Sequence, residues 1–152
     1  ADDMVLVKTL HAVTLLYTLL QKGFEPGVPI AKKVIVVCPT SLVSNWDNEL
    51  TKWLHGRVRT VPICDSTRDV AIADMQRFAA EKSRDQVLII SYETFRAHCT
   101  HVCKDHACHL LICDEAHRLK NDETLTNKAL ASLPCRRRVL LSGTPMQNDL
   151  EE

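Results

Sequence analysis

The sequence predicts an α/β domain of three layers, in which a mainly parallel sheet lies between two layers of helices. Three observations predict this class. Five short runs rich in Val, Ile and Leu are apolar at every position, segments of helical period alternate with these runs, and polar residues follow most of them. Runs that are apolar throughout are typical of strands buried on both faces, and their alternation with helices favours a parallel sheet.

The elements can be assigned in chain order. The expected strands are Val34–Cys38, Val58–Cys64, Val87–Ser91, Leu110–Cys113 and Val139–Ser142. The expected helices are Lys8–Lys22, Ser41–Leu54, Arg68–Lys82, Glu93–Cys103 and Asp122–Leu133. No internal repeat or low-complexity tract interrupts them, so we expect one domain.

The second expected helix has the clearest apolar face. Its large apolar residues recur at steps of four, four and three, at Leu42, Trp46, Leu50 and Trp53. Ser41 is suited to be its N-cap, and Gly56 is suited to end it.

Composition excludes several classes of protein. The chain has 152 residues, of which 45% are hydrophobic and 25% charged, as in ordinary globular domains rather than disordered or fibrous ones. No apolar run reaches the length of about 18 residues that a membrane span needs. The 19 basic and 19 acidic side chains cancel, so affinity for a polyanion would have to come from local patches.

The seven cysteines are an odd number, and several lie within apolar runs. This distribution favours buried free thiols in a reducing compartment over a disulfide framework. The first residues show no signal peptide. Because the chain lacks an initiator methionine and ends without a stop or cap signal, we expect it to be a piece of a longer protein.

The strongest local signal is the pair Asp114 and Glu115, directly after an apolar strand. Ligands of parallel sheets bind at the carboxyl ends of the strands. There, one carboxylate can hold Mg²⁺ through water while the next orients and deprotonates an attacking water, as in nucleotide hydrolysis. The alternative is a pair of ordinary acidic residues at a helix N-terminus.

A lysine and a threonine, Lys8 and Thr9, open the first expected helix. Such a pair is half of a phosphate-binding loop, in which the ammonium reaches the phosphates and the hydroxyl contacts the metal. The glycines that would make the pair specific are absent.

Five motifs together resemble the first half of the SWI/SNF-type ATPases, which are double-stranded-DNA translocases of helicase superfamily two. They are Asp2-Asp3-Met4-x-Leu6-x-Lys8-Thr9-Leu10, Pro39-Thr40-Ser41-Leu42-Val43-x-x-Trp46, Ile89-Ile90-Ser91-Tyr92-Glu93-Thr94, Asp114 to Asn121 and Leu141 to Asn148. The stretch from Ile90 to Arg96 and the segment Arg118 to Asn121 are most similar to the homologous-recombination branch.

The resemblance implies a RecA-like lobe, ATP and Mg²⁺ as cofactors, and specific residue roles. Nucleotide-binding residues would be Asp3, Met4, Leu6, Lys8 and Thr9, with Mg²⁺ held by Thr9 and Asp114 and water activated by Glu115. Coupling of the nucleotide and DNA sites would fall to His117, Ser142, Gly143 and Thr144. The DNA-contacting loops would contain Pro39, Thr40, Ser41, Ser91 and Tyr92, whose hydroxyls can contact phosphate without adding charge.

The resemblance also implies partners and a location. These are double-stranded DNA, a RecA-type recombinase filament or chromatin, a second ATPase lobe and the nucleus, with no membrane association. Residues 1–152 would be a partial first lobe, without its leading strand and without the second lobe. Because hydrolysis in these motors needs an arginine from the second lobe, we expect this piece alone to turn over ATP negligibly.

Two valines depart from the family pattern. Val5 and Val7 stand where the family has glycines in the phosphate loop. Such a loop needs positive φ and close backbone approach, which β-branched residues oppose. At about 1–3 kcal/mol of strain for each misfit, nucleotide binding should be impaired.

Three alternatives stay open at this stage. The lobe could survive as a non-catalytic interaction scaffold. The Cys and His residues between His98 and His109 could hold structural zinc, although they lack a clean C-x2-C pair. The basic residues Arg118, Lys120 and Arg136–Arg138 could contact DNA or form simple solvated turns.

Overall fold

The computed structural model describes residues 2–21, 32–64, 67–116 and 124–141, with the backbone alone for residues 2–8 and 124. Its strands are β1 (Val34–Cys38), β2 (Thr60–Pro62), β3 (Val87–Ser91), β4 (Leu110–Cys113) and β5 (Arg137–Leu140). Its helices are α1 (Asp2–Gln21), α2 (Val43–Leu54), α3 (Arg68–Ala79), α4 (Tyr92–His98) and α5 (Thr124–Ser132), with 3-10 turns η1 (Thr40–Leu42) and η2 (Cys99–His101).

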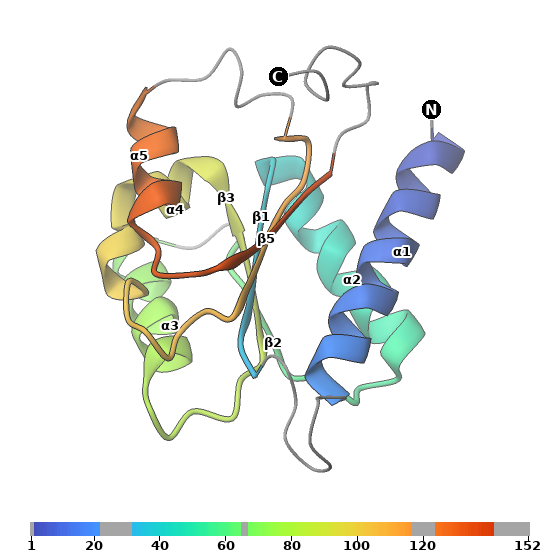
Figure 1. Ribbon diagram of the computed structural model, residues 1–152, viewed down its shortest axis with the longest axis horizontal. Coiled ribbons are helices and arrows are strands. Elements are labelled where there is room, and N and C mark those ends of the chain that lie inside the picture. Colours follow the sequence, from blue (N-terminus) through green and yellow to red (C-terminus); the bar gives the residue numbers. More distant parts are fainter. Residues whose placement is uncertain (1, 22–31, 65–66, 117–123, 142–152) are drawn as a thin grey trace.

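The strands form one parallel sheet in the order β2-β3-β1-β4-β5. Helices α1 and α2 cover one face, and α3, α4 and α5 cover the other (Figure 1). Alternate residues of β1 belong to the two cores: Val36 packs under α1 and α2, whereas Val37 packs under α3 to α5. The predicted three-layer α/β fold with a parallel sheet is therefore confirmed.

The three central strands begin and end where the apolar runs predict. Every residue of β1, β3 and β4 is buried, as expected of strands with helices on both faces. The two edge strands differ from the prediction. β2 is shorter than the expected Val58–Cys64, and β5 begins at Arg137 rather than Val139, with most of its residues exposed. The predicted burial of the last strand is wrong because that strand has a neighbour on one side only.

Helix α2 starts later than predicted. The turn η1 occupies residues 40–42, so Ser41 is not the N-cap of α2; Leu42 takes that place without a side-chain bond. The buried face is correspondingly shifted to Val43, Trp46, Leu50 and Leu54, while Trp53 is 42% exposed. The predicted stop is confirmed, since α2 ends at Leu54 and Gly56 follows with φ of 74°.

Helix α1 begins at Asp2, whereas the sequence predicts a start at Lys8. The phosphate-loop segment is therefore helical, and none of the described residues 2–9 has a positive φ. Valine at positions 5 and 7 is compatible with this helix, because its backbone avoids the positive φ that glycine adopts freely. None of the described helices, α1 included, is long and apolar enough to cross a membrane.

Candidate nucleotide and nucleic-acid site at the carboxyl edge

The predicted site residues that the structure describes gather at the carboxyl edge of the sheet. Asp114 and Glu115 follow β4, Thr40 follows β1, and Ser91 ends β3. Since β1 and β4 pair directly, as do β1 and β3, these three segments are neighbours. The amino end of α1, the helix that contains Lys8 and Thr9, lies on the same side of the sheet (Figure 1).

Asp114 is a buried carboxylate of this edge with two hydrogen-bond donors. It is 4% exposed, and its Oδ2 accepts a 2.8 Å hydrogen bond from Nε1 of Trp46 on α2. Its Oδ1 accepts a 2.9 Å bond from the backbone N–H of Glu115. Each of these donors compensates part of the hydration that the carboxylate loses on burial.

Glu115 has an unusual backbone. Its φ is 56°, which makes it one of two non-glycine residues with positive φ in the described part of the chain. A β-carbon in this region costs about 1 kcal/mol, and such costs are concentrated at functional sites. The next residue is tied to β5 by a 2.7 Å bond from the N–H of Ala116 to the carbonyl of Leu141. This bond connects the turn that follows β4 to the residue that follows β5.

Two of the predicted DNA-contacting hydroxyls are engaged inside the protein. The Tyr92 hydroxyl donates a 2.7 Å bond to the carbonyl of Asp114, and the ring is buried. The Ser91 hydroxyl accepts a 3.1 Å bond from the N–H of Thr94 and so caps α4. Both residues hold the site together, with little hydroxyl surface left for a ligand.

Thr40 and Ser41 are exposed hydroxyl residues of this edge, beside the half-buried Pro39. Thr40 donates a 3.1 Å bond to Oε2 of Glu93. A cavity of about 250 Å³ next to it is lined by Thr40, Ser91 and Glu93 together with two cationic or titratable side chains, Arg68 and His98. The sequence did not indicate Arg68, which lies in no motif, and it indicated His98 only as a possible zinc ligand.

Two carboxylates of the carboxyl edge act on the Cys38 thiol. Burial raises the pKa of the Cys38 thiol well above its usual range, and the charges of Asp114 and Glu93 raise it further. The Cys38 thiol, at the end of β1, therefore lies within the electrostatic influence of both carboxylates. Carboxylate oxygens of this type are ligands that Mg²⁺ prefers.

The structure describes the other predicted site residues only in part or not at all. Thr9 is 3% exposed in α1, while for Asp3, Met4, Leu6 and Lys8 the structure describes the helical backbone alone. His117, Ser142, Gly143 and Thr144 lie outside the described residues, as do Arg118 and Lys120.

The possible zinc site does not form among the described residues, which contain no cluster of three or more metal-ligating side chains. The candidates point to different partners instead. His101 bonds Gln76, His106 bonds the carbonyl of Ala79, His109 accepts from the backbone of Lys32 and Lys33, and Cys108 donates to Cys135. Cys99 and Cys103 are the exception, because both contact the Ser132 hydroxyl, but among the described residues no third candidate ligand joins them.

The basic run 136–138 divides into two kinds of residue. Arg138 donates to the carbonyls of Leu130, Leu133 and Cys135, so it joins α5 to β5. Arg136 and Arg137 are exposed at the opposite, amino edge of the sheet.

Comparison with known proteins agrees with this geometry. A profile of the SNF2-related domain matches residues 1–152, the whole chain. Among solved structures, the Sulfolobus solfataricus SWI2/SNF2 ATPase core in complex with double-stranded DNA matches with a TM-score of 0.70. That match covers 95% of this chain and 27% of the other at 20% identity, so it supports the fold.

Several longer proteins are similar in sequence. Protein CHROMATIN REMODELING 25 of Arabidopsis thaliana is 62% identical over 152 residues, which are all of this chain and 17% of that protein. DNA repair and recombination protein RAD54 of Oryza sativa subsp. japonica is also 62% identical, with 15% of its length covered. A RAD54-like protein of Drosophila erecta is 51% identical over 154 residues, which are 19% of its length.

Proposed function

Because this chain belongs to the SNF2-related domain family, we propose that it is part of the first RecA-like lobe of an ATP-dependent double-stranded-DNA translocase. The protein would act in recombinational DNA repair or chromatin remodelling in the nucleus, as the names of its relatives suggest. The observation that carries this proposal is the carboxylate pair at the tip of β4, with Asp114 oriented by Trp46.

The carboxylate half of the site fits Mg²⁺. Both oxygens of Asp114 accept one hydrogen bond each and retain lone pairs that can bind the water shell of a metal ion. Glu115, on a fixed turn beside it, is suited to orient and deprotonate a water molecule. A magnesium ion held here would stabilise negative charge on a phosphate.

The phosphate half of the site does not fit a triphosphate. The segment from Asp2 to Thr9 is helical, and beyond its first turn the N–H groups of a helix bond within the helix. The first turn carries two acidic residues, Asp2 and Asp3, which disfavour an anion at that helix end. We therefore propose that the chain binds nucleotide weakly, and that Val5 and Val7 are the reason.

The other implied roles follow from the family and remain proposals. Thr40 and Ser41 are the exposed hydroxyls that would contact the DNA backbone, with Arg68 nearby as a cation. A recombinase filament or chromatin would be the larger partner. Hydrolysis would require the arginine of a second lobe, so the 152-residue chain alone would turn over ATP negligibly.

Equilibrium titration with a fluorescent ATP analogue and Mg²⁺ tests the proposal. The double variant Val5→Gly/Val7→Gly should bind about 30-fold more tightly or better, which corresponds to relief of about 1 kcal/mol at each valine. Val70→Gly, an exposed valine of α3, is the matched control and should leave affinity unchanged.

The titration also separates the scaffold alternative. Micromolar binding by the valine form would contradict the proposed impairment. Failure of the glycine variant to bind at any accessible concentration would favour a non-catalytic scaffold derived from such a lobe.

A further inference from the structure

Three adjoining hollows lie along the amino edge of the sheet, opposite the candidate nucleotide site. The first, of about 840 Å³, lies before β2 and β3; the second, of about 520 Å³, lies before β3, β1 and β4; the third, also of about 520 Å³, lies before β4 and β5. The first and second share Ser83, Arg84 and Asp85, and the second and third share His109. Their order therefore follows the order of the strands across the sheet.

Exposed cations dominate the lining of these hollows. We name six of them the basic edge: Lys32, Arg59, Lys82, Arg84, Arg136 and Arg137. Three carboxylates line the same hollows, those of Glu81, Asp85 and Asp105. In a chain whose charges cancel overall, this edge is a local positive patch of the kind that affinity for a polyanion requires.

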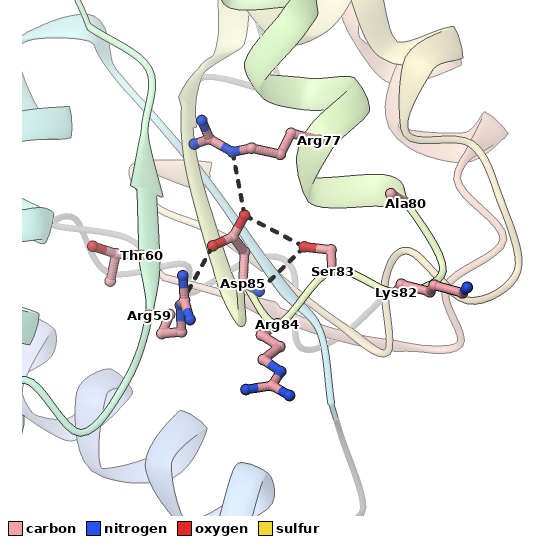
Figure 2. A pocket seen from close by; sticks show the side chains of 8 residues that line it. All are labelled: Arg59, Thr60, Arg77, Ala80, Lys82, Ser83, Arg84 and Asp85. Atoms are coloured by element: carbon pink, nitrogen blue, oxygen red, sulfur yellow. Dashed lines mark hydrogen bonds and ion pairs between the residues drawn. The ribbon is translucent and has the colours of Figure 1, made fainter.

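An ion-pair network shapes the first hollow. Oδ1 of Asp85 lies 3.8 Å from Nε of Arg59, and Oδ2 lies 3.5 Å from Nε of Arg77, which also pairs with Asp74 (Figure 2). Figure 2 shows the Arg84 and Lys82 side chains directed away from this carboxylate, without a bond to the residues drawn. Asp85 thus pairs with Arg59 and Arg77 in the lining of the first hollow, while the Arg84 and Lys82 side chains are directed away from it.

The His109 side chain lines two of the hollows, and the neighbouring positive charges affect its pKa. Burial lowers its pKa, and the charges of Lys32, His106, Lys33 and Arg137 lower it further. Groups from the segments before β1 and β4 and from the start of β5 therefore act on the same imidazole.

We propose that the basic edge binds the phosphodiester backbone of DNA, as a second contact separate from the loops at the carboxyl edge. Five strands about 4.8 Å apart span roughly 19 Å, which is the rise of five or six phosphates along one strand of a duplex. The six cations of the basic edge match that number.

The lining favours a phosphate backbone over a protein partner. None of the described residues that line the three hollows is Trp, Tyr or Phe, the aromatic anchors on which protein interfaces depend. Exposed arginines and lysines that line a surface in this way are instead typical of sequence-independent backbone contacts. The inference needs neither ATP nor the carboxyl-edge site, so it can fail or hold independently of the proposed function.

Lysine footprinting on the unmodified chain tests where DNA lies. A blunt 20-base-pair duplex should protect Lys32 and Lys82 from acetylation, whereas Lys128, exposed on α5, should react as in free protein. Polyglutamate at equal charge concentration provides the comparison with an acidic protein segment. Protection of Lys32 and Lys82 that is stronger with the duplex supports the proposal; equal, weaker or absent protection by the duplex overturns it.

Two matched variants supply an independent readout. Lys82→Ala should reduce the slope of log affinity against log salt concentration by about 0.9, the value of one phosphate contact, and Lys128→Ala should leave it unchanged. An equal change of slope in both variants, or in neither, would overturn the proposal. Because the footprint uses the unmodified chain, the test stands even if a variant folds poorly.

Discussion

The indole Nε1 of Trp46 donates a 2.8 Å hydrogen bond to Oδ2 of Asp114 and so connects helix α2 to the tip of strand β4. Both residues are buried, with Trp46 fully so. The tryptophan therefore has two functions: it fills the core between α1, α2 and the sheet, and it orients the carboxylate assigned to the metal.

Trp46→Phe should remove the donor while keeping an aromatic ring in the core. Leaving a buried carboxylate oxygen without its partner should lower the free energy of unfolding by about 1–3 kcal/mol, as measured by urea denaturation. Trp53→Phe is the control, because Trp53 bonds Glu49 on the surface and its loss should change stability by less than about 0.5 kcal/mol. Equal effects of the two substitutions would contradict the assigned role of Trp46.

The positive φ of Glu115 predicts that the residue suited to the reaction is not the residue that makes the protein most stable. At φ of 56°, glycine is free of the strain that any β-carbon causes. We expect Glu115→Gly to be more stable than Glu115→Ala by about 1 kcal/mol, although both lack the carboxylate. Thermal unfolding of the two variants measures this difference, and a less stable glycine variant would show that the turn does not store strain.

Lys33 joins the end of α3 to the loop before β3. Its ammonium, 7% exposed as a residue, donates to the carbonyls of Phe78 at 2.9 Å and Ser83 at 3.4 Å, and also to that of Asp85. Lys33→Met should cost about 2–3 kcal/mol because buried carbonyls lose a charged donor. Lys32→Met, at the exposed neighbouring position, should cost less than about 0.5 kcal/mol in the same denaturant titration. A small effect at Lys33 would mean that water replaces the ammonium.

The surroundings of His109 predict that the free energy of unfolding decreases in acid. Its Nδ1 accepts from the N–H groups of Lys32 and Lys33 at 3.0 and 3.1 Å, which requires that nitrogen to be unprotonated. Because the folded-state pKa is lowered, the unfolded chain binds the proton first, and stability falls as pH drops below the unfolded value of about 6.5. Wild-type protein should therefore lose more stability between pH 7.5 and 5.5 than His109→Gln.

The matched control for this pH dependence is His11→Gln, on the exposed side of α1. It should show the wild-type dependence on pH. A His109→Gln variant with an unchanged pH profile would contradict the assignment.

The centre of the fold was predictable because burial on both faces leaves a direct mark in the sequence. Val34–Cys38, Val87–Ser91 and Leu110–Cys113 are apolar throughout and match β1, β3 and β4. The edge strands were not placed correctly, since a strand with one neighbour needs no continuous apolar run. The turn η1 was also missed, and it shifts the buried face of α2 from Trp53 to Leu54.

The site was predictable only in part. Asp114 and Glu115 are visible in sequence because a carboxylate pair follows an apolar run, but their partners are not. A buried indole N–H needs an acceptor, so Trp46 could have been suspected as a donor, whereas the internal bonds of Ser91 and Tyr92 depend on tertiary packing. The basic edge was hidden because its cations come from four separate segments that only the sheet brings together.

The most direct test of the central claim is paramagnetic relaxation by Mn²⁺, added with ATP to the Val5→Gly/Val7→Gly variant in place of Mg²⁺. The account predicts broadening of the amide signals of Thr40, Glu115 and Ala116 at the carboxyl edge, its loss in an Asp114→Asn background, and sharp signals for Arg84 and Arg137. Broadening at Arg84 and Arg137 with sharp signals at Glu115 and Ala116 would contradict it, because the nucleotide would then lie at the opposite edge of the sheet.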